Sequence, residues 1–163
     1  MYDWDGAPAG YVETIPKAVE NTKTLANKYK ADPMVNVIPA PHSLHAASTD
    51  MVLAGHELAK ELGTKFHMHV AEEPFDDTMV IIHGVWLKPE EIKTLGAKGG
   101  GLVYCPSSNM FLADGITDIP LMMKSGVRIA LGSDGACSNN RISVFEEMRM
   151  VSLLLACVGQ NDS

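Results

Sequence analysis

The hydrophobic residues of this chain recur with two periods, one typical of strands and one typical of helices. In the segment 65–72 the apolar residues alternate with His67 and His69, which predicts a strand with a buried apolar face and both imidazoles on the other face. Glu72 follows where this strand ends. The stretch therefore brings two imidazoles and a carboxylate to one end of a predicted strand.

The remaining elements alternate between the two periods along the chain. Short apolar runs predict further strands, and helical spacing predicts helices between them. We expect a loop at 1–10 and a polar tail at 159–163, and in between strands at 34–39, 65–72, 79–83, 101–106 and 127–131 and helices at 11–30, 50–62, from 87 onward, 119–125 and 143–157. Alternating strands and helices predict an α/β fold with a parallel sheet covered by helices. The whole chain, 1–163, is expected to be a single domain.

One connection is too short for this topology. Between Glu72 and Met79 there are only residues 73–78, whereas a parallel crossover needs roughly a dozen residues or more. We expect that a mobile segment is omitted from the sequence here; a true deletion is the alternative.

Composition narrows the class of protein. The chain has 163 residues, of which 46% are hydrophobic, and a formal net charge of -7. The acidic balance argues against nucleic acid or an anionic membrane surface as a partner, and no signal peptide or membrane-length apolar run is seen. Cys105, Cys137 and Cys157 are odd in number and widely spaced, so we expect packed thiols in a protein of the reducing cytoplasm.

Polar residues lie at or just past the ends of the predicted strands. They are His42, His69, His83, Asn109 and Asp134. In barrels of parallel strands the active site lies at the carboxyl ends of the strands, and imidazole and carboxylate are the ligands that zinc prefers. The alternative for any single residue is a packed histidine or a solvated carboxylate, but five in equivalent places indicate a site.

Five motifs in this order resemble one enzyme family. They are PHS (41–43), HMHVAE (67–72), HGVWL (83–87), CPSSNM (105–110) and GSDGACSNN (132–140). Together they are similar to the amidohydrolase superfamily, in the branch of 5'-methylthioadenosine/S-adenosylhomocysteine deaminases and triazine chlorohydrolases, over about residues 34–158. The resemblance implies a partial (β/α)8 TIM barrel with about strands 4 to 8 and their helices.

The resemblance also implies a role for individual residues. His69 and Asp134 would bind one divalent metal ion, with zinc expected and iron the alternative, and Asp134 would also take a proton from the attacking water. Glu72 would carry the proton to the ring nitrogen and leaving group, His83 would orient the water, and His42 would contact the substrate.

Two of the remaining motif residues and one more histidine are expected to be structural. Asn109 and Ser138 are assigned to loop architecture before catalysis, and His67 either to packing or to the support of a metal ligand.

The implied reaction is hydrolytic deamination of a small aminated N-heterocycle, such as an adenine nucleoside or another purine or triazine ring. Hydrolytic dechlorination of a triazine remains open. So does a catalytically incomplete barrel fragment with a structural or assembly role, because the strand-one HxH metal ligands and the small β-sandwich of the family have no counterpart in these residues. We expect such a fragment to associate with itself or with the missing barrel half.

Overall fold

The computed structural model describes residues 1, 3–4, 9–43, 46–69 and 77–159. The chain divides into two compact units, residues 1–70 with 78–80 and residues 71–77 with 81–163. Four strands, β1 (Phe66–His69), β2 (Met79–Ile82), β3 (Gly101–Tyr104) and β4 (Arg128–Leu131), form one sheet in the order β1-β2-β3-β4. The fold is α/β, as the alternation of periods predicts.

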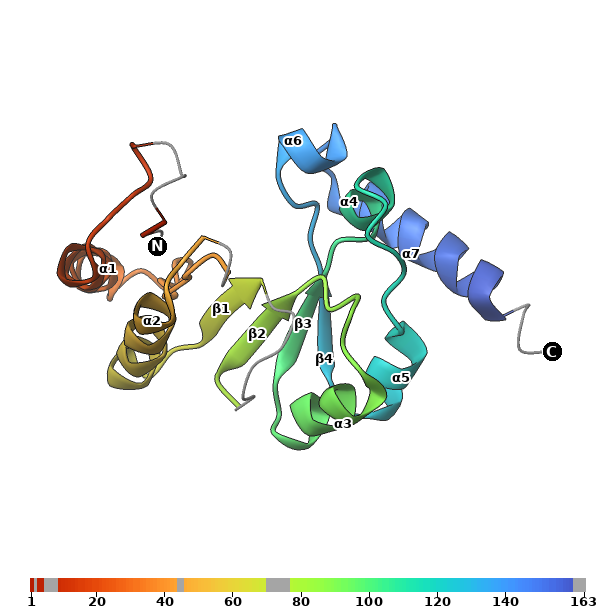
Figure 1. Ribbon diagram of the computed structural model, residues 1–163, viewed down its shortest axis with the longest axis horizontal. Helices are drawn as coiled ribbons and strands as arrows, with labels where there is room; N and C mark the ends of the chain where they lie inside the picture. Colours follow the sequence, from red (N-terminus) through yellow and green to blue (C-terminus); the bar gives the residue numbers. More distant parts are fainter. Residues whose placement is uncertain (2, 5–8, 44–45, 70–76, 160–163) are drawn as a thin grey trace. The chain divides into compact units, whose positions relative to one another are not determined.

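The first unit packs helix α1 (Ile15–Tyr29) against helix α2 (Thr49–Leu62) (Figure 1). Pro16 lies in the first turn of α1, where the missing N–H of proline costs no helical hydrogen bond. Ser48 caps α2 by accepting a hydrogen bond from the Met51 N–H at 3.1 Å, and Gly63 ends it in the left-handed conformation with φ 63°. Both helices were predicted by their apolar spacing.

Strand β1 confirms the expected alternation. Phe66 and Met68 are 2% and 1% exposed, while His67 and His69 are only half-buried on the other face. The period of two in the sequence therefore places both imidazoles on one side of the strand.

The strand predicted at 34–39 does not form. The backbone turns at residues 32–35, where the Met34 N–H donates to the Asp32 carboxylate, and Met34 is 89% exposed. Further along, the segment meets β1 through hydrogen bonds from the His67 N–H to the Pro39 carbonyl and from the His69 N–H to the His42 carbonyl. From His67 to His69 the chain advances by two residues in β1, whereas from Pro39 to His42 it advances by three in the neighbouring segment. A regular ladder needs equal steps on both strands, so none forms here.

In the second unit β3 and β4 pair in parallel, with Gly101 opposite Arg128 and Tyr104 opposite Leu131. Because the strands are parallel and in register, the residues that follow Tyr104 and Leu131 emerge at the same edge of the sheet. Strand β4 is an edge strand of the sheet, and its residues are alternately exposed and half-buried. It is therefore less buried than its continuous apolar run predicts.

Helices α3 (Pro89–Ala97) and α5 (Ile119–Lys124) pack against each other beside these strands. Their contact is very close at Gly96, where a Cβ would lie 1.9 Å from the Ser125 carbonyl oxygen. Only glycine fits this position without a shift of the backbone.

Three helices lie beyond the carboxyl ends of β3 and β4: α4 (Pro106–Phe111), α6 (Ala136–Asn139) and α7 (Val144–Gly159) (Figure 1). The sequence predicts α7 but not the two short helices, because α4 and α6 bury polar residues and have no apolar period. Among the described residues, none of the helices is both long and apolar enough to cross a membrane.

The expectation of three packed thiols is wrong for two of them. Cys105 is buried, whereas Cys137 and Cys157 are exposed on α6 and α7. Burial, and then the negative charges of Asp134 and Glu147, raise the pKa of the Cys105 thiol to about 12.

Candidate active site

Asp134 lies on the turn that follows β4, with a left-handed backbone of φ 59°. Its Oδ2 atom accepts hydrogen bonds from the Ser108 hydroxyl at 2.7 Å and the Ser138 hydroxyl at 2.8 Å. Ser108 belongs to α4 and Ser138 to α6, so the two short helices beyond the sheet hold this carboxylate from two sides.

The surroundings of Asp134 favour its charged form. Burial alone would raise the pKa of this carboxyl, but hydrogen bonds from Ser108, Ser138 and the Gly135 backbone, together with the nearby His83, bring the pKa below its ordinary value. Asp134 is therefore an anion at neutral pH, which is the state needed to bind a cation or to accept a proton.

His83 directly follows β2 and also has a left-handed backbone, with φ 67°. The Thr117 hydroxyl donates to the His83 carbonyl oxygen at 2.7 Å, and the His83 Nε2 lies 3.8 Å from the Asp134 Oδ2. Left-handed conformations are uncommon for residues other than glycine and are concentrated at functional sites. Both candidate residues in this unit share this feature.

Asn109 fixes the orientation of the His83 ring. The amide oxygen of Asn109 lies 2.8 Å from His83 Nδ1 and accepts its proton, which directs Nε2 to the side of Asp134. Asn109 is fully buried, and its Nδ2 group is a buried polar atom with no hydrogen-bond partner among the described residues. A buried amide with an unpaired NH2 group is rare, and it is expected where the amide oxygen has a role such as orienting the His83 ring.

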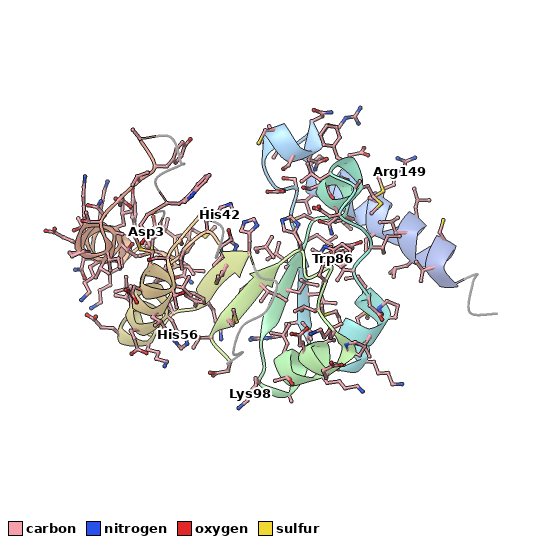
Figure 2. All side chains as sticks on the ribbon, in the orientation of Figure 1. Asp3, His42, His56, Trp86, Lys98 and Arg149 are labelled. Carbon is pink, nitrogen blue, oxygen red and sulfur yellow. The ribbon has the colours of Figure 1, made fainter. Side chains whose placement is uncertain are left out.

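The histidines of the first unit form their own cluster. The rings of His42 and His69 stack with centroids 4.5 Å apart and an interplanar angle of 11°, and His67 meets His69 edge-on at 6.2 Å. Ser43 Oγ lies 3.0 Å from His42 Nδ1. Figure 2 shows His42 beside the carboxyl end of β1. The predicted metal ligand His69 and the predicted substrate-contacting His42 are thus in direct ring contact.

His67 has the environment of a packed histidine. Burial lowers its pKa, and the charge that His42 would carry lowers it further. The role of His67 stays a prediction.

The predicted site residues are distributed over both units. Asp134 and His83 come together in the second unit, and His42 and His69 come together in the first. Glu72 lies outside the described residues, so its role as a proton shuttle stays a prediction. The convergence of His69 with Asp134 on one metal ion also stays a prediction, since the two belong to different units.

The second unit offers two donor atoms to a divalent ion. Across residues 1–69 and 77–159, apart from the gaps given above, no three His, Cys, Asp or Glu side chains gather as a metal site. Two ligand atoms about 2.0–2.2 Å from a tetrahedral zinc ion lie roughly 3.4 Å apart, close to the 3.8 Å between His83 Nε2 and Asp134 Oδ2. An anionic oxygen and an unprotonated imidazole nitrogen are suitable donors, and this pair needs further ligands.

Two residues of this site escaped the sequence analysis. Ser108 is fully buried against Asp134, and Glu147 is 1% exposed on α7. Asn109 and Ser138 were assigned to loop architecture, yet each contacts a candidate catalytic side chain. The four residues became visible only once the helices α4, α6 and α7 were placed next to the turn after β4.

Comparison with known proteins shows the family. The amidohydrolase family matches residues 73–162, more than half of the chain, and the chain belongs to this family. A 5-methylthioadenosine/S-adenosylhomocysteine deaminase of Desulfovibrio desulfuricans is 34% identical over 167 residues, which cover 88% of this chain and 38% of that protein.

Solved structures show the same fold. An adenosine deaminase from Xanthomonas campestris with bound zinc matches with a TM-score of 0.88 and 22% identity, over 98% of this chain and 41% of its own. An atrazine chlorohydrolase from Arthrobacter aurescens complexed with zinc matches with a TM-score of 0.73 and 18% identity, over 82% of this chain and 35% of its own. The chain spans about two fifths of the length of such relatives and has the fold of part of a TIM barrel.

Proposed function

We propose that this chain supplies the later strands of a metal-dependent barrel hydrolase that removes an amino group from an N-heterocycle, with an adenine nucleoside as the substrate class. The observation that carries the proposal is the approach of His83 Nε2 to within 3.8 Å of the Asp134 Oδ2 at the carboxyl edge of the sheet. The deaminase and the zinc-bound adenosine deaminase to which the chain is similar support the substrate class and the metal.

Each residue has a distinct task in this proposal. His69 and Asp134 hold one divalent ion, most simply zinc, which when bound lowers the pKa of a water molecule. The anionic Asp134 accepts the proton of the attacking water, and the Nε2 lone pair of His83 accepts a hydrogen bond that orients this water. Glu72 donates a proton to the ring nitrogen, which makes the amino-bearing carbon more electrophilic. Asp134 passes its proton to the departing ammonia as the carbon–nitrogen bond breaks, and Glu72 regains a proton from the added hydroxyl, which becomes the carbonyl of the product.

His42 completes the proposal as the residue that contacts the substrate. Its ring already stacks on His69, so a heterocycle next to the proposed metal would lie close to it. A neutral imidazole offers one donor and one acceptor, which match the alternating acceptors and donors on the edge of a purine.

The remaining metal ligands come, in this proposal, from the part of the barrel that these residues do not include. This is supported by the share of the relatives that the chain covers, about two fifths of their length. Location in the reducing cytoplasm belongs to the same proposal and is supported by three cysteines without disulfides.

Dechlorination of a triazine is the second candidate function. It is favoured by the likeness to the atrazine chlorohydrolase and would use the same water with a different leaving group. An inert fragment is the third candidate, and it predicts no turnover and no stoichiometric metal.

The test compares the complete barrel that carries these residues with its Glu72→Gln variant. We expect zinc-dependent release of ammonia from adenine nucleosides, and a loss of roughly 100-fold or more in kcat for the variant, because proton transfer from a side chain contributes about that much. Glu90→Gln, on the exposed first turn of α3, is the matched control and should keep full activity. Chloride release from a chlorinated triazine would favour the second function, and full activity of Glu72→Gln would rule out the shuttle.

A further inference from the structure

Helix α7 buries a carboxylate at the centre of a hydrogen-bond network. Glu147 is 1% exposed and is the buried residue of this helix. Its Oε2 atom accepts the Ser107 backbone N–H at 3.0 Å, and its Oε1 atom accepts a hydrogen bond from the Asn139 side-chain Nδ2 at 2.8 Å. Buried carboxylates are costly, so one that is kept with both oxygens paired has a specific task.

The two partners of Glu147 are sequence neighbours of the two serines that bind Asp134. Ser107 precedes Ser108 in α4, and Asn139 follows Ser138 in α6. The Asn139 Nδ2 group also donates to the Ser133 carbonyl oxygen at 2.7 Å, directly before Asp134. One carboxylate therefore connects α4, which supplies Ser108, with α6, which supplies Ser138.

We infer that Glu147 is a positioning residue, which holds the Ser108 and Ser138 hydroxyls against the Asp134 Oδ2 and so keeps that carboxylate correctly oriented. Its own carboxylate bonds to Ser107 and Asn139, and it acts on Asp134 through the two short helices. The consequence for catalysis rests on the proposed function, whereas the geometric role of Glu147 does not.

The network requires a carboxylate at this position. Both groups that face Glu147 are N–H donors, and a carboxylate presents two acceptors. In Glu147→Gln the amide would direct its own NH2 group at one of these donors. One contact is then lost and a buried donor is left unpaired, which moves α4 or α6 relative to Asp134.

The experiment is side-chain NMR on the 163-residue chain, with signals of the Asp134 Cγ and of the Ser108 and Ser138 hydroxyl protons. We expect Glu147→Gln to shift the Asp134 Cγ signal and to speed exchange of at least one hydroxyl proton by about tenfold or more, as loss of a hydrogen bond to a charged group implies. Glu146→Gln is the matched control on the same helix. Glu146 is partly exposed, and its carboxylate lies 3.8 Å from Arg149 of α7 itself. Unchanged Asp134 and hydroxyl signals in a folded Glu147→Gln chain would overturn the inference.

A second variant decides the matter if Glu147→Gln does not fold. Asn139→Ala removes one arm of the network and leaves the Ser107 contact intact, so the Ser138 hydroxyl should exchange faster while the Ser108 hydroxyl does not. Equal protection of Ser138 in this variant and in the unchanged chain would contradict the inference. Since neither readout requires turnover, an absence of deaminase activity would count against the proposed function alone.

Discussion

His83 Nε2 lies 3.8 Å from Asp134 Oδ2, and both residues have left-handed backbones, with φ 67° and 59°. His83 directly follows β2 and Asp134 lies on the turn after β4, so the pair joins the ends of two strands of the sheet. Each side chain has its own support, Asn109 for His83 and two serines for Asp134. The candidate site is therefore held by hydrogen bonds that can be removed one at a time.

Replacing Asn109 with leucine should free the His83 ring to exchange its tautomer. In the unchanged chain at pH 8, 15N NMR should show the proton of the neutral ring on Nδ1, because the Asn109 oxygen accepts it. In Asn109→Leu we expect a mixture with the Nε2–H form. A proton on Nε2 in the unchanged chain would mean that the amide has the opposite orientation and would contradict the proposed role of Nε2.

Removing the Ser108 hydroxyl should raise the pKa of Asp134. The two serine hydroxyls offset the effect of burial, so Ser108→Ala or Ser138→Ala brings the pKa of this carboxyl back toward or above its ordinary value of 3.8. A carboxyl whose pKa is lowered by folding stabilises the folded chain at pH values above its ordinary pKa. This contribution is lost as the pH falls through the pKa of the folded state. We therefore expect each variant to lose about 1–3 kcal/mol in free energy of unfolding at pH 7 and less at lower pH.

Urea denaturation at pH 7 and pH 3 measures this difference. Ser107→Ala is the matched control in α4, because it keeps the backbone N–H that Glu147 accepts. If Ser108→Ala lost the same free energy of unfolding at both pH values, the Ser108 hydroxyl would not act through the charge of Asp134.

Substituting Gly96 with alanine should destabilise the second unit. The added Cβ would lie 1.9 Å from the Ser125 carbonyl oxygen, so α3 and α5 must separate. We expect a loss of about 1–3 kcal/mol or more, measured by thermal denaturation. Gly159→Ala, at the end of α7 with nothing within 4 Å of the new Cβ, is the control and should leave the melting temperature unchanged or slightly raised.

The three cysteines should differ sharply in reactivity. Burial and the charges of Asp134 and Glu147 raise the pKa of the Cys105 thiol to about 12, so at pH 8 it contains almost no thiolate. Cys137 and Cys157 are exposed. A thiol reagent should therefore modify two cysteines in the folded chain and three in denaturant, as mass spectrometry can count. Rapid modification of Cys105 in the folded chain would show that the region next to Asp134 is open.

The sequence predicted the parts of the fold that follow a regular apolar period. Alternation around His67 and His69 located β1 and its two faces, and Ser48 and Gly63 marked the ends of α2. The prediction of a strand at 34–39 is wrong, because the apolar residues of this segment lack a neighbouring strand in regular register. The motifs marked His83 and Asp134, which the structure brings together.

The supporting residues could not be found in the same way. Ser108, Asn109 and Ser138 lie on helices of six and four residues, too short to show a period. Glu147 lies on α7 next to another glutamate, and only tertiary contacts distinguish the buried one from its exposed neighbour. Single polar residues gain their roles from partners distant in sequence, which composition and spacing do not encode.

Anomalous diffraction at the zinc edge from crystals of the complete barrel tests the central claim most directly. The account predicts one peak about 2.0–2.2 Å from a nitrogen of His69 and an oxygen of Asp134, with His83 next to it. A peak bound elsewhere, or an Asp134 carboxylate that lies far from the ion bound by His69, would contradict it.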